Sequence, residues 1–578
     1  MKHRLCLIAA LGMMLSAPLP AQTNRPQQPE PASGRSEKPL AHAQRHMVAA
    51  AHPLAVEAGL QMLDAGGSAV DAMIAVQLVL NLVEPHASGL GGGAYLLHYE
   101  AASRMVRAYD GRETAPAAVT ADLFMRDGKA MTFRDAVAGG RSVGTPGVVR
   151  LLEIAHRKHG RLPWARLFQP AIDIAENGFP LSSRLHTLLR RDRTIAGEAA
   201  ARAYFLNAEG TPKAAGTLLR NPEFAQTLRA IATGGADAFY RGDIARAIVG
   251  AVRSHPINPG LLSEADLAEY QVREVDALCS PYRVYRVCGM PPSSSGGIAV
   301  LQMLGLLSHR DMSAVAPEST QAVHLLAEAG RLAYADRSRW VADDRFVDVP
   351  VRGLLDPAYL AARARLIQPR SMGKATAGTP PGARLAYADD AVDEVAGTSH
   401  IAIVDGDGNA ASMTTTIENF FGSRVLVRGF LLNNQLTDFN FTEQDSGQPA
   451  VNAVAPGKRP RSSMAPTLVF RDNGDLHLVL GSPGGSRIIN YVAKTLIATL
   501  DWGLDIQAAI ALPNTGSRNG PTEIERGTAA EELAAPLRAM GHDVEITDMT
   551  SGLHGIMRVG NGWQGGADPR REGIAKGR

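Results

Sequence analysis

Cysteine, aromatic residues and an excess of either charge are all scarce in this chain. Of its 578 residues, 3 are cysteine and 5% are aromatic, and 59 basic residues stand against 57 acidic ones, which gives a formal charge of +2. A nucleic-acid-binding protein would show a basic excess, so nucleic acid is not an expected partner. The 45% of hydrophobic and 20% of charged residues are typical of a soluble globular protein.

Long apolar runs are missing as well. The run Leu5–Leu15 is far shorter than the ~20 residues that span a bilayer. It follows two basic residues and precedes small residues that end at Ala21, which is the layout of a secretory signal peptide over residues 1–21. We therefore expect export to the periplasm or the exterior, no membrane partner, and a disordered leader from Gln22 to about Arg45.

The few cysteines leave little scope for metal or disulfide chemistry. Cys6 leaves with the predicted signal peptide, while Cys279 and Cys288 either pair in an oxidising compartment or remain buried thiols. His156 and His159 share one predicted helix without an acidic third ligand, so we expect them to be solvated. The glycine-rich GLGGGA at 89–94 follows a helix, whereas a dinucleotide site follows a strand. Neither a metal nor a cofactor is expected.

Helices and strands recur along the whole chain without a linker. Apolar residues at helical spacing predict a helix over 53–65, with Gly66-Gly67 as its C-cap, and Ser68 caps a second predicted helix, 69–83, which is apolar nearly all round. Further helices are predicted near 147–158, 222–233, 320–335 and 356–366, and strands at 281–288, 400–404, 409–417, 466–470 and 475–480. This pattern favours one large sandwich of helical layers around sheets over a string of small domains.

The segment Gly397–Ser423 is typical of a β-hairpin, with two predicted strands joined by the turn DGDG at 405–408. If the loop has four residues, Thr398 lies opposite Thr415; if it has five, Thr398 lies opposite Thr416. Hydroxyls surround Thr398 in either register. Threonine also favours strands without any catalytic purpose, so the hairpin alone does not establish a site.

Two segments rich in glycine and serine accompany the hairpin. KRPRSSMAPT at 458–467 places Ser462 and Ser463 in a loop, and GSPGGSRI at 481–488 places Gly484 and Gly485 after a predicted strand. Two consecutive glycine N–H groups in such a turn can point at one oxygen, as an oxyanion hole requires. LLNNQLTDF at 431–439 adds the carboxylate of Asp438.

In this combination the chain resembles the γ-glutamyltranspeptidase, or glutathione hydrolase, family of N-terminal-nucleophile hydrolases. Ten motifs between about Arg45 and Arg570 come in that family's order: MVAAAHPLAVEAGLQMLDAGGSAVDAMIAV, EPHASGLGGGAY, YDGRETAP, GTPGVV, MPPSSSGG, GTSHIAIVDGDGN, NNQLTDF, KRPRSSMAPT, GSPGGSRII and ADPR. The resemblance implies an α+β fold, a four-layer αββα sandwich. It also implies one precursor that cuts itself at Gly397–Thr398 into a large subunit, 22–397, and a small subunit, 398–578.

The resemblance assigns roles to individual residues. Thr398 would be the nucleophile, supported by the hydroxyl of Thr416, which selects the five-residue loop; the N–H groups of Gly484 and Gly485 would hold the oxyanion. The donor's α-carboxylate would contact Arg112, Ser462 and Ser463, and its α-amine would contact Asp438, Gln435 and Glu418. Many members carry Asn at the position of Glu418 and some bacterial ones carry Glu; either can accept from the amine.

The implied activity is attack on glutathione and other γ-glutamyl compounds, with transfer to water, amino acids or dipeptides. One alternative is a β-lactam side-chain or other amide acylase on the same fold, which need not keep the charged donor-binding residues. Another is an inactive binding protein, against which the intact Thr398 and Thr416 weigh. The linker 440–458 has no Tyr for the lid that covers the site in some members, so the sequence leaves lid formation open.

Overall fold

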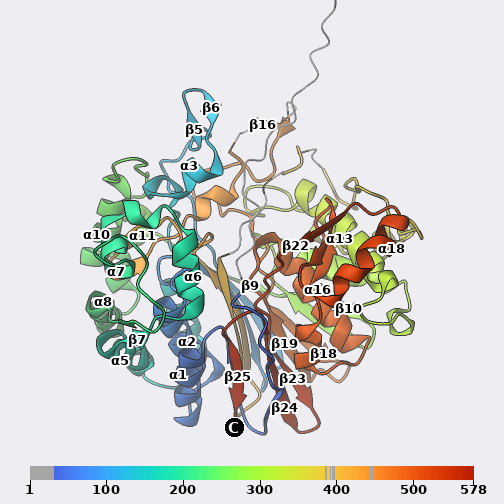
Figure 1. The fold of residues 1–578 in the computed structure, drawn as a ribbon, viewed down its shortest axis with the longest axis horizontal. Helices are drawn as coiled ribbons and strands as arrows, with labels where there is room; N and C mark the ends of the chain where they lie inside the picture. The colour runs from blue at the N-terminus through green and yellow to red at the C-terminus, as the bar shows by residue number, and fades with distance from the viewer. Residues whose placement is uncertain (1–31, 385–386, 391, 393–396, 442–443, 446–447) are drawn as a thin grey trace, which may run out of the picture.

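Two seven-stranded antiparallel sheets lie face to face with helices on both outer sides (Figure 1). The computed structural model describes residues 32–384, 387–390, 392, 397–441, 444–445 and 448–578. The predicted signal peptide, residues 1–21, the first part of the predicted leader and part of the 440–458 linker lie outside the described residues. The expectation that the leader is disordered up to about Arg45 is wrong, because Ala41–Ala43 form a strand that pairs with residues 563–565. The four layers confirm the predicted αββα sandwich.

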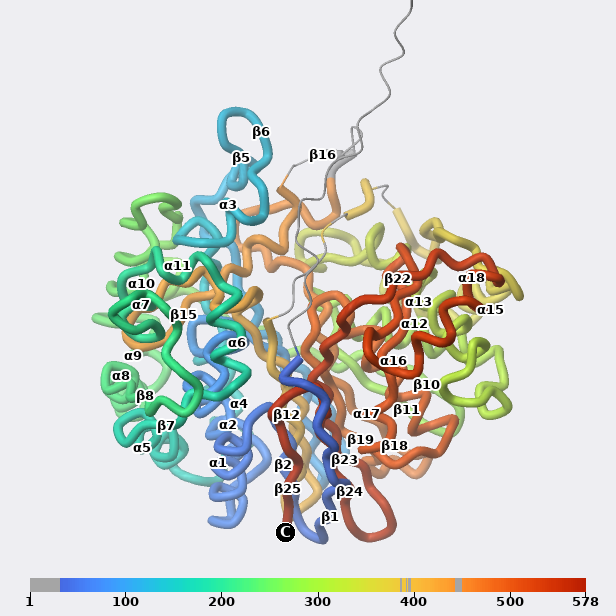
Figure 2. Tube along the Cα trace, in the orientation of Figure 1, coloured from blue at the N-terminus to red at the C-terminus, as the bar shows by residue number. Residues whose placement is uncertain are grey.

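Strands from distant parts of the chain alternate in both sheets (Figure 2). The first sheet has the order β25 (Ile574–Gly577), β2 (Met47–Ala50), β12 (Thr398–Val404), β13 (Ala410–Thr416), β3 (Gly93–Glu100), β4 (Met105–Gly111), β9 (Arg273–Asp276). The second has the order β1 (Ala41–Ala43), β24 (Gly562–Ala567), β23 (His554–Val559), β19 (Leu476–Gly481), β18 (Thr467–Arg471), β11 (Tyr285–Gly289), β10 (Leu278–Tyr282). β12 and β13 face β23 and β19 across the sandwich.

Each sheet has its own helical layer. The layer on the first sheet contains α1 (Pro53–Asp64), α2 (Ala69–Val83), α4 (Val148–His159), α5 (Gln169–Asn177), α6 (Ser183–Arg191), α7 (Ala199–Phe205), α8 (Pro222–Gly234), α9 (Asp237–Tyr240), α10 (Gly242–Arg253) and α11 (Glu264–Ala268). The layer on the second sheet contains α12 (Gly296–Leu307), α13 (Thr320–Trp340), α15 (Pro357–Ala364), α16 (Ile488–Leu500) and α17 (Ile506–Ala511). The expected helices are therefore present, with ends shifted by a few residues.

Shorter elements complete the chain. The helices are α3 (Phe133–Val137), α14 (Val351–Leu354) and α18 (Ala534–Ala539), with the 3-10 turns η5 (Gln435–Asp438) and η6 (Gly485–Arg487) near the hairpin. The strands are β5 (Met125–Arg126), β6 (Lys129–Ala130), β7 (Phe179–Pro180), β8 (Leu218–Leu219), β14 (Leu426–Val427), β15 (Phe430–Leu431), β16 (Gln444–Asp445), β17 (Gln448–Pro449), β20 (Thr515–Ser517), β21 (Thr522–Glu525) and β22 (Val544–Thr547).

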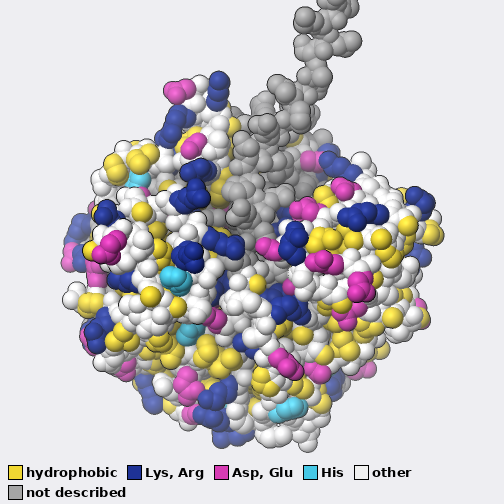
Figure 3. Space-filling view, in the orientation of Figure 1, with side chains coloured by type: hydrophobic (Ala, Val, Ile, Leu, Met, Phe, Trp, Pro, Cys, Tyr) yellow, Lys and Arg dark blue, Asp and Glu magenta, His cyan; other side chains and the backbone are white. Residues whose placement is uncertain are grey.

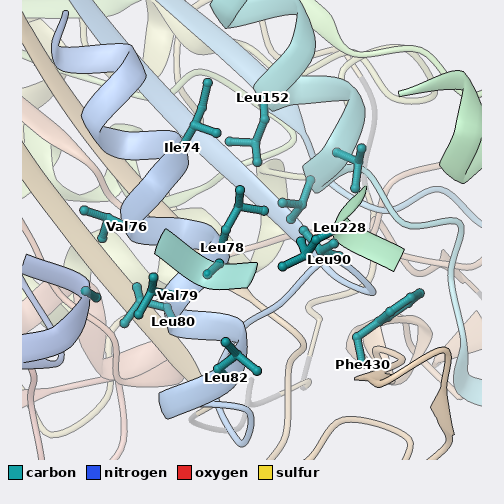
Figure 4. Close-up of a cluster of buried hydrophobic side chains, with 14 of the residues drawn as sticks. Ile74, Val76, Leu78, Val79, Leu80, Leu82, Leu90, Leu152, Leu228 and Phe430 are labelled. Atoms are coloured by element: carbon teal, nitrogen blue, oxygen red, sulfur yellow. The ribbon is translucent and has the colours of Figure 1, made fainter. Parts of the chain in front are cut away.

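Helix α2 packs against the hairpin β12–β13. Ser68 and Asp71 form a capping box at its start, and every residue of the helix is buried, as its all-round apolar sequence predicts. Figure 4 shows its apolar side chains beside Leu152 of α4, Leu228 of α8 and Phe430. One face of α2 packs directly on β12 and β13. The hairpin is thus fixed against a rigid, buried element.

The question that the sequence left open about the two cysteines is resolved by the hairpin β10–β11. Cys279 and Cys288 lie directly opposite each other in its register and form a disulfide. Within the described part of the chain, no helix has the length and apolar character needed to cross a membrane. On the face seen in Figure 3, basic and acidic side chains are intermingled, in keeping with the balanced net charge.

Candidate active site

The loop between β12 and β13 has five residues. Val404 pairs with Ala410, and Thr398 therefore lies opposite Thr416. The buried carboxylate of Asp405 sets this length, because it accepts hydrogen bonds from the backbone N–H groups of Asp407 and Asn409, both at 3.0 Å. Its second oxygen accepts from the N–H of Ala69, the first residue of α2, at 3.0 Å. The register that the resemblance selected is confirmed.

A chain of hydroxyls connects Thr398 with the bond that precedes it. Thr398 Oγ1 donates to Thr416 Oγ1 at 3.3 Å, and Thr416 Oγ1 donates to the carbonyl oxygen of Gly397 at 2.6 Å. The N–H of Glu418 donates to the same Thr416 hydroxyl at 2.8 Å, which directs the Thr416 proton toward Gly397. All of these side chains are buried. The carbonyl of Gly397 is thus polarised beside the hydroxyl that is predicted to be the nucleophile.

The start of β12 is held by side chains in place of a second strand. β13 pairs with the whole of β12, whereas β2 pairs with it only from Ile401 onward. Along the remaining edge, Arg571 Nη1 donates to the carbonyl of Thr398 at 3.4 Å, and Ser399 Oγ donates to Glu84 Oε2 at 2.8 Å. Sequence reasoning missed Glu84 and Arg571, because both contacts span more than 170 positions in the chain.

The glycine pair lies in a turn beside the start of β12. β19 ends at Gly481, and a Cβ there would be 2.3 Å from the ring of His400, two residues after Thr398. The turn that follows places Gly484 at φ 139° and Gly485 at φ 58°, a region in which side chains are disfavoured. Both positions therefore favour glycine, as the oxyanion-hole prediction assumes.

The predicted donor-binding residues form one buried cluster. Arg112 Nη2 donates to Asp438 Oδ2 at 2.6 Å, and Gln435 Nε2 donates to the same oxygen at 2.6 Å. Arg112 also donates to the carbonyls of the two residues before Ser462, namely Pro460 at 3.1 Å and Arg461 at 3.0 Å. We call Arg112, Glu418, Gln435, Asp438, Ser462 and Ser463 the donor clamp.

Glu418 connects the donor clamp with Thr398. Its carboxylate accepts from Asn434 Nδ2, the neighbour of Gln435, while its backbone N–H bonds Thr416. Glu418 is buried and has a φ of 79°, a conformation that costs energy in a residue other than glycine. A continuous path of bonded and adjacent residues therefore leads from Thr398 to Asp438 and Arg112.

Glu113 is a neighbour of the donor clamp that sequence reasoning did not single out. It is fully buried, and its carboxyl oxygens make no hydrogen bond to another residue in the described part of the chain. Burial raises the pKa of the Glu113 carboxyl to about 8, although the charge of Arg112 opposes the shift. At neutral pH this carboxyl is mostly protonated. The sequence feature that could have identified Glu113 is its position directly after Arg112 in the GRETAP motif.

One group of side chains has the composition of a metal site. Atoms of His324, Glu328 and His542 lie within 4.8 Å of one another. His324 and His542 are hydrogen-bonded to each other at 2.8 Å, and the other ring nitrogen of His324 donates to the Gln368 carbonyl at 2.7 Å. Glu328 accepts from Arg331 Nε at 3.0 Å. The group is satisfied by the protein itself and shares no residue with the Thr398 site.

The expectation that His156 and His159 are solvated is wrong. His156 Nε2 donates to the carbonyl of Leu162 at 2.9 Å. His159 lies 2.7 Å from the hydroxyl of Tyr109 and stacks on His98 at a ring distance of 3.8 Å. Both rings are half-buried: His159 lies against β3 and β4, and His156 lies against Leu162 and the ring of Trp164. They have structural contacts and lie outside the donor clamp.

Known proteins resemble the chain along its whole length. Residues 55–578 match the γ-glutamyltranspeptidase family. A glutathione hydrolase proenzyme of Bacillus subtilis (strain 168) is 35% identical over 588 residues, covering 99% of this chain and 98% of the relative. The Acylase ACY 1 proenzyme of Pseudomonas sp. (strain SE83) is 34% identical over 546 residues, 93% of each chain. The crystal structure of a cephalosporin acylase from Bacillus halodurans superimposes with a TM-score of 0.83 at 26% identity, covering 94% of this chain and 98% of that one. The chain therefore belongs to the γ-glutamyltranspeptidase family.

Proposed function

We propose that this protein is a glutathione hydrolase and γ-glutamyltransferase whose nucleophile is Thr398. The observation that carries the proposal is the buried Arg112–Asp438 pair, connected to Thr398 through Glu418. A γ-glutamyl group ends in an α-carboxylate and an α-amine, which need one cationic and one anionic partner. When the donor binds, the carboxylate would take Arg112 and the amine would take Asp438, so that one ion pair is exchanged for two. Full-length relatives named glutathione hydrolase proenzymes support this activity.

The same hydroxyl would first cut the precursor. Thr398 Oγ attacks the carbonyl carbon of Gly397; the new C–O bond forms as the C–N bond breaks, and the departing nitrogen takes up the hydroxyl proton. Water then hydrolyses the ester, which releases a carboxylate at Gly397 and restores the Thr398 hydroxyl. The hydrogen bond from Thr416 to the Gly397 oxygen supports this step, because it stabilises the negative charge that develops there.

Cleavage would supply the base that turnover requires. A free α-amine has a pKa of ~7.7–8.0, so a useful fraction is unprotonated near neutral pH and takes the proton from Thr398 Oγ. Oγ attacks the γ-carbonyl, the N–H groups of Gly484 and Gly485 hold the oxyanion, and the leaving amine receives the proton. Water or the amine of an amino acid or dipeptide then attacks the γ-glutamyl ester and frees Thr398.

Before it can act on a substrate, the chain would be exported and processed. Residues 1–21 would direct export to the periplasm or the exterior and be removed. Self-cleavage would then give a large subunit, 22–397, and a small subunit, 398–578, that begins with the nucleophile. Export is consistent with the Cys279–Cys288 disulfide, because such bonds persist in oxidising compartments.

The direct test is incubation of the purified protein with glutathione, with and without glycylglycine. We expect release of glutamate in the first case and formation of γ-glutamyl-glycylglycine in the second. The Thr398→Ala variant is the control: it has no hydroxyl to start either reaction, so it should run as one uncleaved chain and release no glutamate. Failure of the cleaved enzyme to act on any γ-glutamyl donor would contradict the proposal.

The second candidate is an amide acylase, favoured by the likeness to proteins that are named acylases. An acylase for a donor without an α-amine has no use for Asp438. The two functions separate on γ-glutamyl-p-nitroanilide and glutaryl-p-nitroanilide, which differ only in that amine. We expect the γ-glutamyl compound to be preferred, with the preference lost in Asp438→Ala. A preference for the glutaryl compound would favour the acylase.

A further inference from the structure

The motif MPPSSSGG, residues 290–297, has no part in the proposed chemistry, yet it lies against the serines of the donor clamp. Ser295 binds the carbonyl of Ser462 twice, through its N–H at 2.7 Å and its hydroxyl at 2.6 Å. Ser294 Oγ donates to the carbonyl of Met464 at 2.7 Å. The N–H of Ser462 in turn donates to the carbonyl of Ser293 at 3.3 Å. The three serines of the motif thus form a template for the backbone of residues 462–464.

Arg337, in the last turn of α13, connects this template with the side chain of Ser463. Its Nε donates to Ser295 Oγ at 2.8 Å, and its Nη2 donates to Ser463 Oγ at 2.8 Å. Arg337 is 3% exposed, and the serines it binds are fully buried. A planar guanidinium can donate in two fixed directions at once, which the single nitrogen of lysine cannot reproduce.

These bonds restrict the directions in which the serine protons can point. A hydroxyl has one proton to donate, and Ser463 Oγ already accepts from Arg337, so its proton is directed away from the guanidinium. Ser462 Oγ accepts from the N–H of Met464 at 3.1 Å, which likewise leaves its proton to be donated elsewhere. Two hydroxyls oriented in this way suit a carboxylate, which only accepts hydrogen bonds.

We propose that Arg337 and Ser295 are positioning residues that orient Ser462 and Ser463 as hydrogen-bond donors to the donor's α-carboxylate. They would thereby determine the preference for donors that carry this group. The inference rests on the proposed function, because it concerns the carboxylate end of the same donor clamp. Neither residue needs to touch the substrate.

Three p-nitroanilides isolate the carboxylate. The γ-glutamyl compound has both the carboxylate and the amine, the glutaryl compound has only the carboxylate, and the 4-aminobutanoyl compound has only the amine. In Arg337→Gln and in Ser295→Ala we expect kcat/KM to fall about tenfold or more on the first two, mainly through KM, because bonds to a charged group weaken. On the 4-aminobutanoyl compound, kcat/KM of both variants should stay within about twofold of the wild-type value. Arg337→Lys should recover only part of the lost kcat/KM, since lysine keeps the positive charge but lacks the planar group that donates in two fixed directions.

The controls separate positioning from general damage. Arg352→Gln, an exposed arginine on α14, should match wild type on all three compounds. Each variant is checked for cleavage into two chains and for its melting temperature; if Arg337→Gln does not fold, Ser295→Ala and Arg337→Lys still decide. An equal fall in kcat/KM on all three compounds would overturn this inference but not the proposed function. The same holds if kcat/KM does not fall on the two compounds that carry a carboxylate. A wild-type enzyme that gains nothing from the carboxylate would overturn the proposed function as well.

Discussion

At position 397, the absence of a side chain allows the bond that we propose is cut to lie close to the backbone of Glu418 and Asn419. A Cβ on Gly397 would be 2.3 Å from the carbonyl oxygen of Glu418 and 2.8 Å from the carbonyl carbon of Asn419. Both are backbone atoms, which cannot rotate away as a side chain can. We expect Gly397→Ala to slow self-cleavage at least tenfold, measured as uncleaved precursor on denaturing gels over time after purification.

The matched control is Gly406→Ala, in the loop of the same hairpin, where a Cβ would meet nothing within 4 Å. This variant should be cleaved at the wild-type rate. Cleavage of Gly397→Ala at that rate would mean that the scissile bond moves away from Glu418 and Asn419 before it reacts.

Glu113 should make the stability of the protein depend on pH. Its pKa is raised by burial to about 8 in the folded state, whereas an unfolded chain has a glutamate pKa of about 4.3. The stability that protonated Glu113 contributes is therefore complete below about pH 4.3 and is lost as the pH rises toward 8. Glu113→Gln, which cannot ionise, should melt close to wild type at pH 4.5 and several degrees above it at pH 8.5, as measured by calorimetry.

The exposed residue Glu269 provides the comparison. In Glu269→Gln the difference in melting temperature from wild type should not change across the same pH range. A difference for Glu113→Gln that is equally flat would show that this carboxyl is ionised, or reached by water, in the folded protein.

At the scale of the elements, the hairpin register distinguishes two adjacent threonines. Successive side chains of a strand point to opposite faces, so Thr416 bonds Thr398 and Gly397 whereas Thr415 lies opposite Ser399. Thr416→Ala removes a donor to the developing oxyanion and should slow cleavage by about two orders of magnitude. Thr415→Ala should have a much smaller effect. A gel time course ranks the two, and the reverse ranking would contradict the register.

Elements built from local signals could be predicted from the sequence. The helices α1 and α2, with Gly66 and the Ser68 cap between them, follow from apolar spacing and capping chemistry. The hairpin was predicted too, but the residues alone left its register open, because loops of four and five residues both fit DGDG; only the family resemblance selected the five-residue loop. The decisive contacts are those of the Asp405 carboxylate, which binds its own loop and the N–H of Ala69.

Contacts between distant segments could not be predicted from the residues alone. His159 was expected to be solvated, since nothing near it in sequence reveals Tyr109 and His98 on the neighbouring strands. Arg337 and Arg571 were missed for the same reason. The donor clamp was predicted only because its motifs match a known family; charge and spacing would not have joined Arg112 to Asp438 across 326 positions.

At the scale of the whole molecule, the proposed cut would divide both sheets between two chains. In the first sheet, β12, β13 and β25 would belong to the small subunit, and they pair with β2 and β3 of the large one. In the second sheet, β24 and β18 of the small subunit pair with β1 and β11 of the large one. Strand ladders in both sheets and two shared apolar clusters would therefore join the subunits.

We expect the two subunits to stay together after cleavage and to separate only when they unfold. The disulfide does not link them, because Cys279 and Cys288 both lie in the large subunit. Light scattering after size exclusion should therefore show one species containing both chains, with or without reductant and in 1 M NaCl, which screens surface ion pairs but not apolar packing. In a urea series, the loss of the circular dichroism signal and the dissociation of the two subunits should share one midpoint. Neither chain contains all the strands of either sheet, so each alone would leave strand edges unpaired. Dissociation into subunits that keep their secondary structure would show that each half holds a separate core.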